Sequence, residues 1–105
     1  MIYAKICSAL LRVLRDGDDR ERLKRHVAHW GVRVPENLAE PVMVRVVVYC
    51  AADESLVAWA KELGGDVGDR RGEARSGLLP LGGVERFLEH PAVNRVELSA
   101  KRRLI

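Results

Sequence analysis

The chain of 105 residues contains few cysteines and few aromatic residues: two Cys, two Trp, two Tyr and one Phe. Two cysteines are too few for the disulfide framework that stabilises many small secreted domains. Cys7 and Cys50 both stand inside apolar stretches, where free and buried thiols are expected. We therefore expect a domain without disulfide bonds that folds around an apolar core.

Long apolar runs are also missing. No segment approaches the roughly 18 uninterrupted apolar residues that a membrane-spanning helix requires. The first residues, "MIYAKICSALLRVL", place a lysine before apolar residues, as a signal peptide does. Arg12 interrupts the run, however, and no small-residue cleavage pattern precedes the charged "RDGDDRER". The sequence thus predicts a cytoplasmic protein with no membrane partner.

The charge is balanced, since 18 basic and 15 acidic residues leave a net charge of +3. Basic residues cluster only in "DRR" at 69–71 and "AKRR" at 100–103, and no basic stripe typical of a nucleic-acid-binding protein is present. RNA-binding domains of the ferredoxin-like type carry aromatic residues on their central strands. Tyr49 alone stands in such a position here, so we expect no nucleic-acid partner.

Catalytic motifs are equally scarce. Ser, His and Asp occur, but no "GxSxG" or comparable setting for a nucleophile surrounds any serine. His26 and His29 have a spacing that can bind a metal, yet no third ligand is fixed beside them. We predict a protein that is not an enzyme, with no catalytic residues, no cofactor and no metal site.

Residues 1–41 have the pattern of a helical extension followed by a linker. A second helix, capped by Asp18 or Asp19, is expected to run to about Trp30, and a connector with two prolines follows at 32–41. A first helix before it is indicated by apolar residues at helical spacing: Ile6, Leu10, Val13 and Leu14.

Residues 42–50, "VMVRVVVYC", are mostly β-branched and predict a central strand. A helix is then expected between a cap at Asp53 and a stop at Gly64–Gly65, with an inward stripe that contains Leu56, Ala60 and Leu63. The stretch 66–79 is rich in glycine and charge, and we expect a loose hairpin around Gly72.

Pro80 is expected to open the last helix and Pro91 to close it, although Gly82 and Gly83 weaken it. A short strand follows at 93–98. The order from residue 42 is therefore β-α-β-β-α-β. Right-handed crossovers place both helices on one face. The predicted class is α+β, a ferredoxin-like sandwich with four antiparallel strands at 42–105.

The amino-acid sequence of this second part, which begins at residue 42, resembles the propeptide domains that precede many bacterial subtilisin-like serine peptidases. The stretches concerned are "VRVVVYCA" and "LGGDVGDRRGEARSGLLPLGGVERFLEHPAVNRVELSAKRRL". The residues that match the family's pattern of proline, apolar and acidic positions are Pro80, Leu81, Val84, Phe87, Leu88, Pro91, Val93, Val96 and Glu97. No peptidase domain accompanies them in this sequence.

The resemblance implies a specific mode of action. Such propeptides pack the open face of their sheet against two helices of the peptidase and pass their C-terminal tail through the substrate cleft. This chain is therefore expected to act in trans as an inhibitor or folding chaperone. The implied contacts are the tail residues Lys101, Arg102, Arg103, Leu104 and Ile105, with Asp69 and Glu73 of the hairpin as anions for helix N-termini.

Two alternatives remain at this point. The valines of residues 42–50 cannot all lie under two helices, so the second face of the sheet is covered either by the N-terminal helices or by a partner. That partner is a peptidase in one interpretation. In the other, the chain is a homodimer or an adaptor without a peptidase, and the tail at 99–105 is simply disordered.

Overall fold

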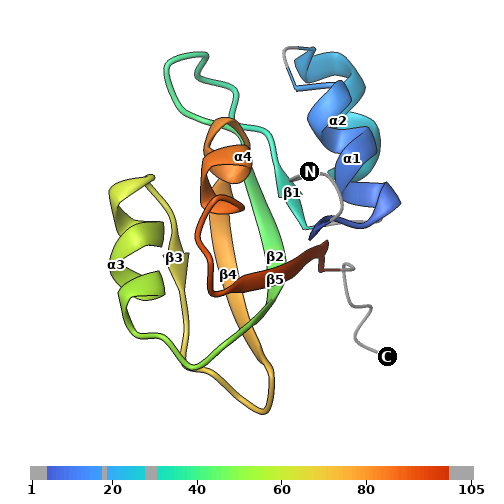
Figure 1. The fold of residues 1–105 in the computed structure, drawn as a ribbon. Helices are drawn as coiled ribbons and strands as arrows, with labels where there is room; N and C mark the ends of the chain where they lie inside the picture. Colours follow the sequence, from blue (N-terminus) through green and yellow to red (C-terminus); the bar gives the residue numbers. More distant parts are fainter. Residues whose placement is uncertain (1–4, 18, 28–30, 100–105) are drawn as a thin grey trace, which may run out of the picture.

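A computed structural model describes residues 5–17, 19–27 and 31–99 of the chain, and these form an α+β fold with a five-stranded antiparallel sheet (Figure 1). The helices are α1 (Ser8–Arg15), α2 (Arg20–Val27), α3 (Ser55–Glu62) and α4 (Val84–Phe87), with a 3-10 turn η2 (Leu81–Gly83) directly before α4. The strands are β1 (Val32–Arg33), β2 (Met43–Cys50), β3 (Asp66–Val67), β4 (Ala74–Pro80) and β5 (Val93–Leu98). The predicted α+β class is confirmed.

Strand β2 is the centre of the sheet. One of its sides pairs with β4 along nearly its whole length, from Met43 opposite Pro80 to Tyr49 opposite Ala74. Its other side pairs with β5 at one end and with β1 at the other. The short strand β3 lies beyond β4, so the order is β3-β4-β2-β5, with β1 continuing the line of β5.

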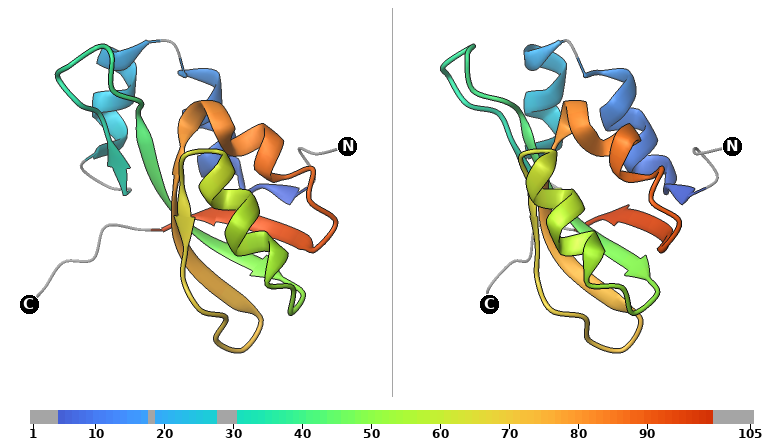
Figure 2. Two further views of the ribbon diagram at one scale, coloured as in Figure 1. Left: turned by 90° about the vertical axis from the view of Figure 1, so that its left-hand side faces the viewer. Right: turned by 60° about the vertical axis from the view of Figure 1, so that its left-hand side comes forward.

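The β-branched residues of β2 explain how the core is built. Val44, Val46 and Val48 are fully buried and point to one face, whereas Arg45 and Tyr49 point to the other face and are exposed. Helices α1, α3 and α4 lie on the side of the buried valines (Figure 2). The helical side chains that complete this core are Leu10, Val13, Leu56, Ala60, Val84 and Phe87.

The N-terminal helices contribute to the same core. Leu10, Val13 and Leu23 are fully buried, and Ile6 forms a parallel bridge with Val96 of β5. Asp19 caps α2, as predicted, since its Oδ1 accepts a hydrogen bond from the Arg22 amide at 3.2 Å. The expected end of this helix at Trp30 lies outside the described residues.

One local prediction was wrong, because the last helix is shorter than expected. Pro80 ends β4 and also stands at the N-cap of η2, and the amide of the next residue, Leu81, donates to the Val42 carbonyl at 2.8 Å. The last helix shrinks to the 3-10 turn and one turn of α4, in keeping with the poor helix propensity of Gly82 and Gly83.

Strand β1 was missed within the expected connector at 32–41, where it pairs Val32 with Val44. The hairpin predicted around Gly72 is confirmed: this glycine has a φ of 62°, which residues with a Cβ rarely adopt. Both cysteines are free, also as predicted.

Candidate protein-binding face

The face of the sheet opposite α3 and α4 is not covered by any of the described helices (Figure 2). We call it the open face. Alternation and strand register assign to it Arg33, Met43, Arg45, Val47, Tyr49, Ala74, Ser76, Leu78, Arg95 and Glu97. Tyr49 retains 36% of its surface exposed. An apolar surface left open in this way is a common feature of protein-interaction sites.

The open face mixes apolar and charged residues, because Arg45 stands between Met43 and Val47 on the central strand β2 and lies opposite Leu78 of β4. Met43, Val47 and Leu78 are half-buried, and no described helix lies over this side of the sheet. Arg95 donates its Nε–H to Glu97 Oε1 at 2.7 Å, so this pair neutralises itself at the β5 margin. Such a surface suits a folded protein partner that offers both apolar and charged contacts.

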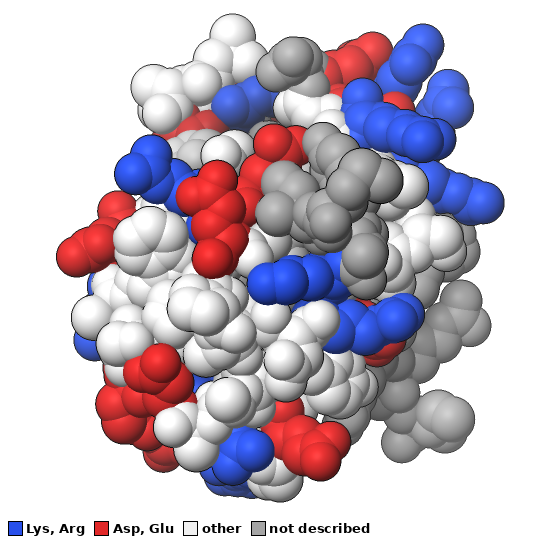
Figure 3. All heavy atoms as spheres, in the orientation of Figure 1, with Lys and Arg blue, Asp and Glu red and all other residues white. Residues whose placement is uncertain are grey.

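The side of the molecule that carries the helices has charged side chains of both signs on its surface (Figure 3). Lysine and arginine side chains gather over α1 and α2, with acidic side chains among them. Arg22 lies 3.4 Å from Asp19, and Lys24 lies 3.0 Å from Glu21. These exposed pairs satisfy each other within α2 and its cap, as on an ordinary solvated surface.

The predicted contact residues fall in two places. Asp69 and Glu73 are both exposed in the loop between β3 and β4. This loop is attached to the end of β2, because Cys50 donates its amide to the Glu73 carbonyl at 3.0 Å and accepts from Arg70 Nε at 3.1 Å. The tail Lys101, Arg102, Arg103, Leu104 and Ile105 lies outside the described residues.

The last described residue, Ser99, lies at the margin of the open face. Its amide donates to the Arg45 carbonyl at 2.9 Å, and its carbonyl accepts from the Gly31 amide at 3.0 Å. Gly31 and β1 occupy the next positions beside β2.

Arg75 is a buried charge that sequence reasoning missed. It points to the helix side of β4, is 2% exposed, and donates to the Gly68 carbonyl at 2.9 Å and to Glu54 Oε1 at 3.1 Å. Burial alone would lower the pKa of Arg75, but the hydrogen bond and charge of Glu54 raise it and prevail. Its position two residues before Gly77 and four before Leu79, both facing inward, was the available signal.

A serine, a histidine and an aspartate meet at the start of α3, with hydrogen bonds that oppose catalysis. Ala92 donates its amide to His90 Nδ1 at 3.0 Å, so the neutral ring carries its proton on Nε2, 3.1 Å from Ser55 Oγ. Ser55 Oγ in turn donates to Asp53 Oδ1 at 2.6 Å. A catalytic triad needs the reverse direction, from serine to histidine to aspartate.

This cluster instead fastens α3 to the turn before β5. The Ser55 hydroxyl and the Ser55 amide both donate to Asp53 and hold the pKa of the Asp53 carboxyl below its usual value. The predicted cap at Asp53 therefore does accept a helix-start amide, although α3 begins only at Ser55.

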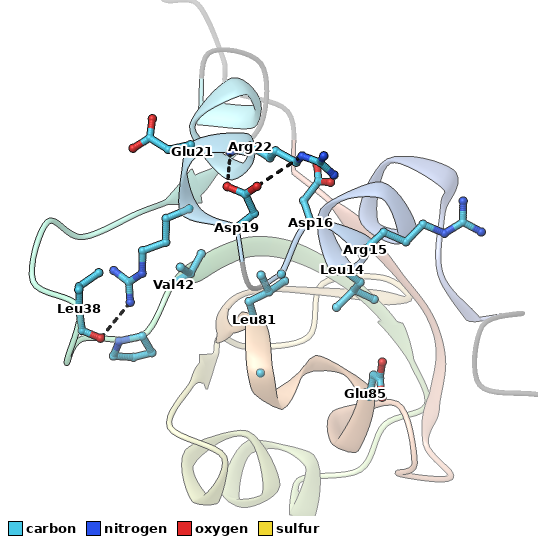
Figure 4. Close-up of a pocket in the computed structure, with 14 residues that line it drawn as sticks. Leu14, Arg15, Asp16, Asp19, Glu21, Arg22, Leu38, Val42, Leu81 and Glu85 are labelled. Atoms are coloured by element: carbon cyan, nitrogen blue, oxygen red, sulfur yellow. Dashed lines mark hydrogen bonds and ion pairs between the residues drawn. The ribbon is translucent and has the colours of Figure 1, made fainter.

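A hollow of about 1010 Å³ opens between the α1–α2 turn, the 35–41 loop and η2 (Figure 4). Its floor is apolar and includes Leu14, Val42 and Leu81. Leu38 stands at its margin and is 79% exposed.

Arg20 holds the loop at this margin, since its guanidinium donates to the carbonyls of Pro35, Asn37, Leu38 and Glu40 at 2.8–3.3 Å. Within the described part of the chain, no group of three or more His, Cys, Asp or Glu could hold a metal ion.

Comparison of the chain with protein-family models, with curated proteins and with solved structures gave no match. Over residues 5–17, 19–27 and 31–99, no helix has the length and apolar character needed to cross a membrane. What the chain does is therefore inferred from its own residues, and the open face is their most distinctive arrangement.

Proposed function

We propose that this chain is a protein-binding module that acts in trans on a subtilisin-like serine peptidase, as an inhibitor, a folding chaperone or both. The main support is the open face, where the half-buried Met43, Val47 and Leu78 lie around Arg45 and no described helix covers the sheet. The opposite face of the same sheet is fully packed. A partner that covers the open face would gain the hydrophobic contribution that the chain alone leaves unused.

We also infer a ferredoxin-like topology for residues 43–98. The strand order β5-β2-β4-β3, with each neighbouring pair antiparallel, agrees with a β-α-β-β-α-β unit. Helices α3 and α4 on one side of the sheet agree with it as well. This is the arrangement implied by the resemblance to subtilisin propeptides.

In the proposed complex, the open face packs against surface helices of the peptidase and the segment Lys101–Ile105 enters its substrate cleft as an added strand. The position of Ser99 supports this division, because this residue is hydrogen-bonded to Arg45 at the margin of the open face and the tail follows it in the sequence. Asp69 and Glu73 in the β3–β4 loop would meet a helix N-terminus, where a negative charge is favourable.

An inhibition assay tests the proposal. The full chain, a version that ends at Ser99, and the open-face variant Val47→Asp are each incubated with a purified subtilisin-like peptidase and a chromogenic peptide. We expect inhibition by the full chain, loss of inhibition on truncation, and at least about tenfold weaker inhibition by Val47→Asp, because a charge is buried in the contact.

Ala58→Asp, on an exposed position of α3, is the matched control and should inhibit like the full chain. Circular dichroism shows that each variant is folded. The proposal is wrong if the full chain does not inhibit any peptidase of this type. The role of the tail is wrong if truncated and full chains inhibit equally.

A further inference from the structure

Two arginines stand side by side on the open face. Arg33 of β1 is the strand partner of Met43, and Arg45 follows two residues later on the same face. Both are exposed. Residues in such diagonal positions have Cβ atoms roughly 7–8 Å apart. Two positive charges at this spacing repel each other.

Neither arginine has an acidic partner among the described residues. Glu97 is diagonal to Arg45 across β2 and β5, but it is bound by Arg95 at 2.7 Å. The repulsion between Arg33 and Arg45 is therefore not relieved within the part of the domain that the structure describes.

Gly31 makes room for the side chain of Arg45. A Cβ placed on Gly31 would lie 2.6 Å from the Arg45 Cβ and 3.4 Å from its Cδ. Gly31 has no positive φ that would require glycine. Because Gly31 has no side chain, it leaves space for the Arg45 side chain to extend toward β1. The sheet therefore fixes where the basic pair lies.

More basic residues follow in the sequence. Ser99 is hydrogen-bonded to Arg45, and Lys101, Arg102 and Arg103 come directly after residue 100. On α2, Arg22 and Lys24 do have acidic partners, Asp19 and Glu21. Arg33 and Arg45 are thus a basic pair on the open face that has no acidic partner among the described residues.

We infer that the surface recognised by the open face is acidic beside the β1–β5 margin, so that carboxylates of a second, different protein pair with Arg33 and Arg45. The inference deepens the proposed function and rests on its choice of the open face. The apolar neighbours Met43 and Val47 favour a protein over a nucleic acid or a membrane. Self-association through this face would bring the basic pairs of two copies near each other and is disfavoured.

The test uses the whole chain and poly-L-glutamate as the probe, followed by amide chemical shifts in NMR. Wild type is compared with Arg33→Glu/Arg45→Glu and with Arg12→Glu/Lys61→Glu, a control with the same charge change on α1 and α3. At low salt, about 20 mM, screening is weak. We expect shifts confined to residues 31–33 and 43–49, at least about tenfold weaker binding for the open-face variant, and about twofold or less for the control.

Several results would overturn the inference: shifts over α1 and α2 instead, equal binding by both double variants, tighter binding of an oligonucleotide of the same charge, or a dimer at low salt that Arg33→Glu/Arg45→Glu dissociates. The outcome is separate from that of the inhibition assay. Failure to inhibit a peptidase removes the peptidase as the partner, whereas failure of this titration removes the acidic surface even where inhibition is observed.

Discussion

Replacing the buried Arg75 with methionine should change the free energy of unfolding by less than about 1 kcal/mol, whereas Glu54→Ala should cost about 1–2 kcal/mol. The asymmetry follows from the exposure of the two partners. Arg75 is 2% exposed, but the side chain of Glu54 is 88% exposed. Removing the arginine leaves a solvated carboxylate, while removing the glutamate leaves a buried guanidinium with one partner fewer.

The magnitudes come from the contacts of Arg75. It makes one hydrogen bond to Gly68 and one to Glu54, and bonds to a charged group contribute about 1.5–3 kcal/mol each. Burying the charge costs several kcal/mol, and its Nε has no hydrogen-bond partner. These terms nearly cancel, and methionine removes both. For Glu54→Ala, access of water to the site reduces the loss of one such bond to about 1–2 kcal/mol.

Urea unfolding followed by circular dichroism measures both variants, with Glu62→Ala on the exposed side of α3 as the control. Glu62→Ala should stay within about 0.5 kcal/mol of wild type. A loss of about 3 kcal/mol or more for Arg75→Met would refute the reasoning, because the ion pair would then be a net source of stability. Equal effects of Glu54→Ala and Glu62→Ala would refute it as well.

Three further predictions concern other parts of the fold. Gly77→Ala should destabilise the fold by about 2 kcal/mol or more, because the new Cβ would lie 2.6 Å from Val67 Cγ1 and 2.8 Å from the Asp66 carbonyl. Gly82→Ala should be neutral or stabilising by up to about 1 kcal/mol, because a Cβ there meets nothing within 4 Å. Thermal unfolding of both variants compares the two effects. Arg20→Met should speed hydrogen exchange at the Glu40 amide but not in β2, because it removes four bonds to loop carbonyls; unchanged exchange would contradict the role of Arg20 in holding the loop. The lowered pKa of Asp53 stabilises the fold above the pKa of the unfolded chain, about 3.9, and this contribution is lost as pH falls through the folded pKa. Asp53→Asn should therefore show less acid sensitivity than wild type between about pH 5 and pH 2.5 in urea unfolding, and an identical pH profile would count against the Ser55 interaction.

The parts of the fold that sequence could predict are those where one pattern dominates. The valines of β2 and the run 93–98 have strong β-propensity, and both are strands as expected. Gly64 has a φ of 89° and ends α3 as predicted. In each of these cases, the local preference and the tertiary structure agree.

The missed features depend on contacts between distant residues. Strand β1 has only two residues and forms because Gly31 and Val32 meet Arg45 and Val44. The glycine that made β4 look weak, Gly77, is needed because β3 passes against it.

The candidate site was predictable only in outline. The sequence indicated that one face of the sheet would need cover, but not which residues form it. The pairing of Arg33 with Met43 depends on β1 and could not be expected from a connector. Arg75 was missed because arginine is usually exposed, and here Glu54 and Gly68 compensate its burial.

Hydroxyl-radical footprinting of the complex with an active-site-blocked subtilisin-like peptidase tests whether the proposed partner binds the open face. We predict slower oxidation of Met43, Tyr49 and Leu78 on binding, with no change at Trp59, which lies on α3 beside His90. Protection of Trp59 with unchanged oxidation of Met43 and Tyr49 would place the contact on the helix side and contradict the account.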